Sequence, residues 1–205
     1  MIFRYDSPVM QFMAKLFDMI LLNLLFLVCC LPVVTVGASC TALHTVTLKY
    51  AAGDEVPVLS CFFSSFKKNF RQSTLMWLIL FLAGGFLYVD SCMAAQLGTG
   101  GIAIKVVLAA ASLVYSMVFL YLFPLQARYQ NSIRASFRNA FLLAAAHFPK
   151  TLCMVCTVLL PLALLLYGTT EIFLLMVIFL LLVGCSVIAG IQARILYSIF
   201  RCHES

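Results

Sequence analysis

Long uncharged stretches, separated by short polar segments, dominate the pattern of hydrophobic and polar positions along this chain. The first stretch runs for about thirty residues, from Met19 to Leu48. As one helix it would be about 45 Å long, which exceeds the roughly 30 Å hydrocarbon core of a bilayer. Pro32 removes a helical hydrogen bond and Gly37 permits a turn. We therefore predict a membrane helix that ends near Leu31, a break over Pro32–Gly37, and a second, shorter helix over residues 38–52.

Four later stretches are also long and apolar enough to cross a bilayer. They cover residues 72–89, 102–127, 151–167 and 172–193. The second of these contains one charge, Lys105, close enough to its start to reach the membrane surface. The pattern predicts an all-α fold with a single integral membrane domain over residues 1–205. It contains five to six membrane helices, depending on whether the short second helix crosses completely.

Two basic amphipathic segments interrupt this pattern. In the first, apolar residues recur at helical spacing from Leu59 to Phe70 while the lysines and arginines occupy other faces. The second covers residues 128–141. We expect both segments to lie at the membrane surface and to meet anionic lipid headgroups or a partner protein. The residues that we expect to make these contacts are Phe62, Phe66, Lys67, Lys68, Phe70, Arg71, Arg128, Arg134 and Arg138.

The two amphipathic segments share a short pattern. Ser65-Phe66-Lys67-x-x-Phe70 matches Ser136-Phe137-Arg138-x-x-Phe141. An internal duplication, as in many transporters, would produce this match. Two independent surface helices under the same physical constraint would produce it equally well, and six positions do not separate these explanations.

Composition supports the membrane interpretation. Hydrophobic residues make up 64% of the chain and charged residues 10%, whereas soluble domains contain about 25% charged residues. The net charge of +6 is spread along the chain. Because there is no dense basic block with interleaved aromatic residues, we expect no nucleic-acid partner.

The distribution of basic residues predicts the orientation. Lysines and arginines gather in the connectors around residues 67–71 and 128–150 and in the C-terminal tail, whereas the connectors 90–101 and 168–171 contain none. By the positive-inside rule the basic connectors and the C-terminus are cytoplasmic. With six helices the N-terminus is cytoplasmic as well, and with five it is outside. We favour six helices in the cell membrane, and we expect the N-terminal segment to be retained as an anchor rather than cleaved.

Among the polar residues of the first two predicted helices, the candidates are Asn23, Thr41, His44 and Thr45. Polar residues inside a membrane either bond a neighbouring helix or line a path for a solute. For Asn23 we favour a bond between helices. Thr41, His44 and Thr45 share one helical face, which suits a hydrated cavity. The alternative, which we favour, is that the hydroxyls bond carbonyls of their own helix and His44 bonds an adjacent helix.

The residue types that carry chemistry are dispersed. The nine cysteines lie mostly within apolar runs, where cysteine packs as a small hydrophobe. Cys153 and Cys156 form a C-x-x-C pattern without a second pair or a nearby histidine cluster. The sequence contains no nucleophile motif and no phosphate-binding glycine loop. We therefore expect no enzymatic activity and no catalytic, cofactor or metal site.

Several segments resemble the YesL family of bacterial membrane proteins. They are NLLFLVCCLPVVTVGASCTAL at residues 23–43, SFKKNF at 65–70, FPLQARY at 123–129 and HFPKT at 147–151. The resemblance extends over nearly the whole chain, and the proline followed by T-x-G is its most specific part. Members of this family are often associated with ATP-binding-cassette carbohydrate uptake systems. No catalytic residues are established for the family, so the resemblance implies a context and no mechanism.

Two alternative functions are therefore considered. The first is a non-enzymatic accessory membrane protein associated with carbohydrate uptake, whose partner would be a sugar permease. The second is a facilitator-type transporter of a small neutral solute. The break at Pro32 and the polar second helix favour the second function. The scarcity of carboxylates at mid-depth argues against an ion-coupled pump, because Asp18, Asp90 and Glu171 all lie near the ends of the predicted spans.

Overall fold

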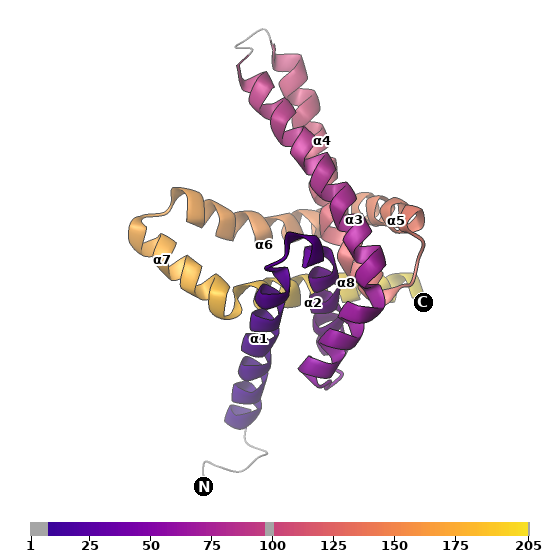
Figure 1. Cartoon of the computed structure of the whole chain (residues 1–205), viewed down its shortest axis with the longest axis vertical. Helices are drawn as coiled ribbons and strands as arrows, with labels where there is room; N and C mark the ends of the chain where they lie inside the picture. The colour runs from indigo at the N-terminus through magenta and orange to yellow at the C-terminus, as the bar shows by residue number, and fades with distance from the viewer. Residues whose placement is uncertain (1–7, 97–100, 205) are drawn as a thin grey trace.

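The computed structural model describes residues 8–96 and 101–204, and the regular structure in these ranges is entirely helical (Figure 1). Arg4 and the other residues before Pro8 lie outside the described part. The elements are α1 (Pro8–Cys30), η1 (Val33–Thr35), α2 (Val36–Ala52), α3 (Val58–Ala95), α4 (Ile102–Arg128), α5 (Ile133–Ala146), α6 (Phe148–Tyr167), α7 (Thr170–Phe179), η3 (Leu180–Gly184) and α8 (Cys185–Glu204).

Within the described residues, five helical stretches are long and apolar enough to cross a membrane. They are Val9–Cys30, Val58–Ala95, Ile102–Arg128, Phe148–Tyr167 and Thr170–Arg201. Helix α2 has 17 residues and is not among them. The predicted fold class, a polytopic helical membrane protein with a short second helix, is confirmed.

The break after the first helix lies where the sequence predicts it. Helix α1 ends at Cys30, and the 3₁₀ turn η1 follows Pro32. The Thr35 hydroxyl donates to the carbonyl oxygens of Cys29 (2.5 Å) and Pro32 (2.7 Å). The indole N–H of Trp77, on α3, donates to the carbonyl oxygen of Val33 at 2.8 Å. These bonds satisfy carbonyls that the interrupted helix leaves without partners.

Gly37 has a different role from the predicted one. It lies inside α2 rather than in the turn. A Cβ atom at this position would lie 2.3 Å from the carbonyl oxygen of Ser73 and 2.6 Å from Cβ of Trp77. The glycine is therefore needed because the backbones of α2 and α3 approach each other closely here.

Helix α3 joins two segments that the sequence pattern separates. The basic amphipathic segment and the following apolar stretch form one helix of 38 residues, about 57 Å long. The predicted span over residues 72–89 is therefore part of a longer helix, and the surface position of residues 59–70 stays a prediction. Nothing between the two segments stops the helix, because the polar residues there, such as Arg71 and Gln72, are good helix formers.

The second amphipathic segment is divided between two elements. Arg128 is the last residue of α4, and a short connector separates it from α5. Ser132 caps α5, its hydroxyl accepting a hydrogen bond from the backbone N–H of Ala135 at 3.4 Å. Arg134 and Arg138 lie exposed on this separate amphipathic helix.

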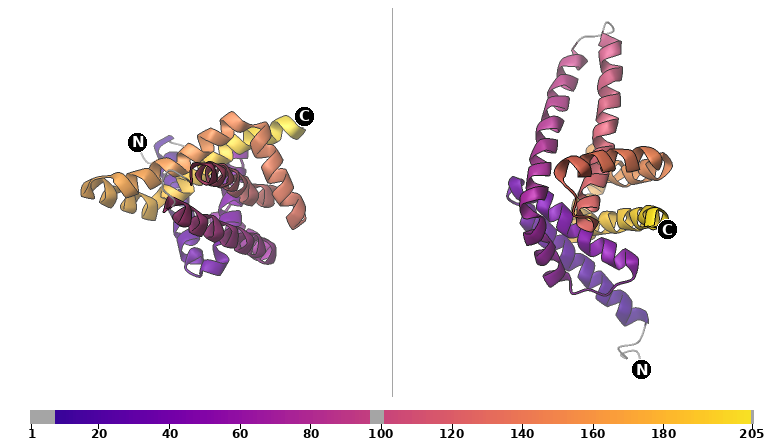
Figure 2. Two further views of the ribbon diagram at one scale, coloured as in Figure 1. Left: turned by 90° about the horizontal axis from the view of Figure 1, so that it is seen from above. Right: turned by 90° about the vertical axis from the view of Figure 1, so that its right-hand side faces the viewer.

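Two helical hairpins extend in different directions from a central packing region (Figures 1 and 2). One is formed by α3 and α4, and the other by α6 and α7. The central region contains a cluster built around Tyr121, Phe123 and Phe200, and a second cluster built around Leu22 and Phe62. Large apolar side chains such as Phe86 and Leu166 are exposed along the hairpins. Such surfaces are expected of helices that face lipid.

The last predicted span is longer than expected and is interrupted. Residues 170–204 continue from α7 through the π-helical turn η3 into α8. A π-helical turn shifts the hydrogen-bond pattern of the helix and leaves carbonyl groups available to other donors. The partner of this turn is a side chain on α1.

Candidate functional site

Asn23 connects α1 to the π-helical turn. Its side-chain nitrogen donates to the carbonyl oxygens of Leu180 (3.0 Å) and Leu181 (2.7 Å). Its side-chain oxygen accepts from the backbone N–H of Ser186 at 3.1 Å. The Ser186 hydroxyl in turn donates to the carbonyl oxygen of Met19 at 2.8 Å. Asn23 is fully buried, so the predicted bond between helices is confirmed and this residue lines no solute path.

The polar face of α2 packs against α3. The Thr41 hydroxyl donates to the carbonyl oxygen of Gly37 (3.0 Å) and lies 2.8 Å from the Ser73 hydroxyl. The Thr45 hydroxyl donates to the carbonyl oxygen of Thr41 (2.8 Å) and lies 2.7 Å from the Ser65 hydroxyl. The predicted bonds to the helix's own carbonyls are therefore present, together with bonds to α3.

His44 is predicted to bond an adjacent helix, and one of its two ring nitrogens makes no such bond. Its Nδ1 atom is buried and has no hydrogen-bond partner. Its neighbours on the same helical face, Thr41 and Leu48, are also buried. His44 is therefore largely buried, with 9% of its surface exposed.

A chain of side-chain amides continues from Ser65 toward α4 and α5. Nδ2 of Asn69 donates to the backbone oxygen (3.1 Å) and the hydroxyl (3.3 Å) of Ser65. Nε2 of Gln126 donates to the side-chain oxygen of Asn69 at 3.5 Å. The side-chain oxygen of Gln126 accepts from Gln72 (3.3 Å) and from the Ser136 hydroxyl (3.4 Å). This network fixes the first half of α3, the end of α4 and the start of α5 relative to one another.

A pocket of about 270 Å³ opens above this network, between the ends of α2 and α4 and the first half of α3. Its buried floor includes Ser65, Asn69 and Gln126, of which Gln126 is only 2% exposed. Three cationic residues line it, one from each helix: Lys49, Lys68 and Arg128. Among the described residues that line the pocket there is no aspartate or glutamate. The remaining lining residues are Thr45, Cys61, Ser64, Ala127 and Gln130.

Aromatic rings hold the guanidinium group of Arg128 in place. Its central carbon lies 5.7 Å from the ring centre of Tyr129, 5.8 Å from that of Tyr197 and 5.3 Å from that of Phe200. Such contacts orient an arginine while it retains its charge. Lys49 and Lys68 are exposed at the edge of the pocket. The arrangement therefore concentrates positive charge over a floor of amides and hydroxyls, which is suited to an anionic group.

Only some of the residues that are predicted to contact lipid or a partner lie at the protein surface. Lys67, Arg71, Arg134 and Arg138 are exposed but do not line the pocket. Phe70 is exposed and Phe66 is half-buried. Phe62 is fully buried in the cluster with Leu22, so the expectation that it contacts lipid or a partner is wrong. Phe62 faces inward because α3 packs its aromatic side against α1 and α2.

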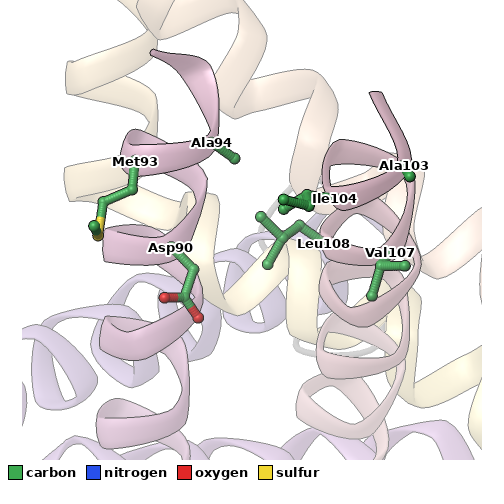
Figure 3. A pocket seen from close by; sticks show the side chains of 7 residues that line it. All are labelled: Asp90, Met93, Ala94, Ala103, Ile104, Val107 and Leu108. Carbon is green, nitrogen blue, oxygen red and sulfur yellow. The ribbon is translucent and has the colours of Figure 1, made fainter. Parts of the chain in front are cut away.

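A second, larger hollow lies between α3 and α4 near the tip of their hairpin (Figure 3). Its volume is about 480 Å³. Asp90 lines it from α3, and Ile104 and Leu108 project toward it from α4. The other lining residues are Met93, Ala94, Ala103 and Val107. One carboxylate among apolar side chains provides no convergent set of polar groups, so we favour the basic pocket as the candidate site.

Groups that could carry catalysis or bind metal do not converge in the described residues. No cluster of three or more histidine, cysteine, aspartate or glutamate residues occurs there. Cys153 and Cys156 are free thiols exposed on α6. The basic pocket itself offers cations, hydroxyls and amides, which bind a ligand more readily than they transform one.

Sequence reasoning found part of this pocket. Thr45, Lys68 and Arg128 are among the predicted residues that line it, whereas Lys49, Asn69 and Gln126 were missed. A signal for the last two exists: each is an amide side chain within a largely apolar or amphipathic helix. Lys49 gave no such signal, because a lysine in the last turn of a helix is explained by the helix dipole alone.

Comparison with known proteins gives two matches. The family described as "Protein of unknown function, DUF624" matches residues 19–91. A relative from Bacillus subtilis (strain 168), described as "Uncharacterized protein YesL", is 31% identical over 161 residues, which cover 78% of this chain and 72% of the relative. No solved structure matches.

Proposed function

Because the chain belongs to the YesL family, we propose that it is a non-enzymatic accessory protein of the cell membrane. In this proposal it acts through its basic face rather than by moving a solute through its interior. The helices would anchor it in the bilayer, and the exposed cations of α3 and α5 would meet anionic lipid headgroups and a partner protein.

The observation that carries this proposal is that polar side chains within the helices form hydrogen bonds to neighbouring helices. Asn23 bonds η3 and α8, Thr41 bonds Ser73, and Gln126 bonds α3 and α5. These groups would have to face water in a solute path, but they are buried in contacts between helices. The exposed cations of α3 and α5, in contrast, remain available at the protein surface.

The basic residues also support an orientation. Lys68, Arg134 and Arg138 belong to elements at the predicted cytoplasmic end, and residues 168–171 belong to the opposite connector. We propose that the basic connectors and both termini are cytoplasmic. Under this proposal α1 and α2 form a full hairpin and the chain crosses the membrane six times.

We further propose that the partner is the permease of an ATP-binding-cassette carbohydrate uptake system. The test is purification of the tagged protein from its own membranes in mild detergent, followed by identification of the proteins that accompany it. A sugar permease should be enriched, and Arg134→Gln/Arg138→Gln should reduce its recovery. Lys105→Gln, which changes a charge at the opposite end of α4, serves as the control. Repeated recovery of the wild-type protein alone would contradict this partner.

A facilitator for a small neutral solute is the second candidate. It is favoured by one observation: Thr45, on the polar face of α2, borders the basic pocket. Uptake of labelled neutral sugars and polyols into proteoliposomes tests it. Flux that falls in Thr45→Val and Gln126→Leu would support a transporter, and equal uptake by empty liposomes would rule it out for these solutes.

A further inference from the structure

We propose that the basic pocket between α2, α3 and α4 binds a phosphate group, carried either by an anionic lipid or by a soluble phosphate compound. This inference concerns a ligand site and does not depend on the identity of the partner protein.

The charge of the pocket is the first reason. Lys49, Lys68 and Arg128 come from three helices and line one space of about 270 Å³. Lys49 and Arg128 each occupy the last turn of their helix, where a cation is favoured by the helix dipole. Lys68 has no such explanation, because it lies in the interior of α3. The like charges of Lys49 and Lys68 face one space and repel each other, and an anion between them relieves that repulsion.

The donors available in the pocket are the second reason. A phosphate has several acceptor oxygens, which lysine ammonium groups and hydroxyls can meet at once. Ser64 adds an exposed hydroxyl beside the cations. The amides of Asn69 and Gln126 form a buried floor whose hydrogen bonds hold it in place. A site that is organised before the ligand arrives binds at lower entropic cost.

The size of the pocket is the third reason. Pockets for drug-sized ligands span about 300–1,000 Å³, so this pocket lies at or just below the lower limit. It accommodates a phosphate and a small substituent, while the open side leaves room for the rest of a lipid or a phosphate ester outside. A large neutral ligand would not offset the positive charge of Lys49 and Lys68.

The test compares two matched variants of the full-length protein, purified in detergent and depleted of lipid. Lys49→Gln/Lys68→Gln removes two cations from the pocket. Lys15→Gln/Lys105→Gln removes two exposed cations that lie outside the pocket and outside the basic face of α3 and α5. Circular dichroism and size-exclusion chromatography verify that both variants fold. Binding of phosphatidylglycerol, phosphatidylcholine and inorganic phosphate is measured by native mass spectrometry and calorimetry.

We expect the wild-type protein to bind at least one phosphate-bearing anion more tightly than phosphatidylcholine. Loss of one charged hydrogen bond should weaken binding by about tenfold, so the pocket variant should lose most of the affinity while the control variant stays close to wild type. Binding of phosphatidylglycerol alone identifies a lipid headgroup as the source, and binding of inorganic phosphate identifies a soluble one. Equal losses in both variants, or binding of neither anion, would overturn the proposal.

Discussion

The side-chain oxygen of Asn23 accepts a hydrogen bond from the backbone N–H of Ser186 at 3.1 Å, although 163 residues separate the two in the chain. The same asparagine donates to two carbonyl oxygens of the π-helical turn η3. The first and last membrane helices are therefore joined by one buried side chain, and the irregular turn has its partner on α1.

This contact predicts the effect of Asn23→Leu. The substitution approximately preserves the side-chain volume. It leaves the carbonyl oxygens of Leu180 and Leu181 without this donor and the backbone N–H of Ser186 without this acceptor. The expected loss of unfolding free energy is about 1–3 kcal/mol, observed as a lower thermal unfolding temperature in detergent. Ser91→Ala is the control, because that hydroxyl bonds only its own helix at the exposed surface. Equal unfolding temperatures for Asn23→Leu and wild type would show that the contact is not needed.

Gly37 provides a second prediction, for the contact between α2 and α3. In Gly37→Ala the new Cβ would lie 2.3 Å from the Ser73 carbonyl oxygen, so the two helices must separate. We expect a destabilisation of about 1–3 kcal/mol, as for other overpacked sites. Gly85→Ala is the matched control, because Cβ at that position has nothing within 4 Å.

The two glycine variants should therefore differ in sign. Gly85 lies inside α3, where alanine is favoured over glycine by about 0.5–1 kcal/mol. Thermal unfolding of both variants in the same detergent measures the difference. If Gly37→Ala were as stable as Gly85→Ala, the close approach of α2 and α3 would be wrong.

The sequence predicts several of the breaks between helices because their signals are local. Pro32 ends α1, the Gly53–Pro57 segment separates α2 from α3, and uncharged length identifies the spans. The π-helical turn had no local signal, because its stability depends on Asn23 in a distant helix. The pocket was only partly predictable for a similar reason: Lys49 and Lys68 meet through the packing of α2 on α3, which sequence periodicity does not specify.

The amphipathic pattern of α3 shows a further limit of sequence analysis. Its aromatic side was interpreted as a surface that meets lipid, but protein and lipid are both apolar partners for such a face. The hydrophobic pattern alone does not distinguish them. The structure divides this face: Phe62 is fully buried, while Phe63 beside it is 40% exposed.

Phe62 and Phe63 therefore provide a third prediction. Phe62→Ala removes a ring from the cluster that includes Leu22, and we expect a loss of about 3–5 kcal/mol. Phe63→Ala should cost much less, because its ring is already partly exposed. Thermal unfolding in detergent distinguishes the two variants, and similar losses would contradict the inward orientation of Phe62.

The central claim is that the chain crosses the membrane repeatedly with its basic connectors on one side. It is tested most directly by labelling single cysteines, introduced into a protein whose nine native cysteines are replaced, with a membrane-impermeant maleimide on intact cells. We expect Gln96→Cys and Glu171→Cys to react from outside, and Lys68→Cys and Ser132→Cys to react only after the membrane is permeabilised. Reaction of Lys68→Cys and Ser132→Cys from opposite sides of the membrane would contradict the claim.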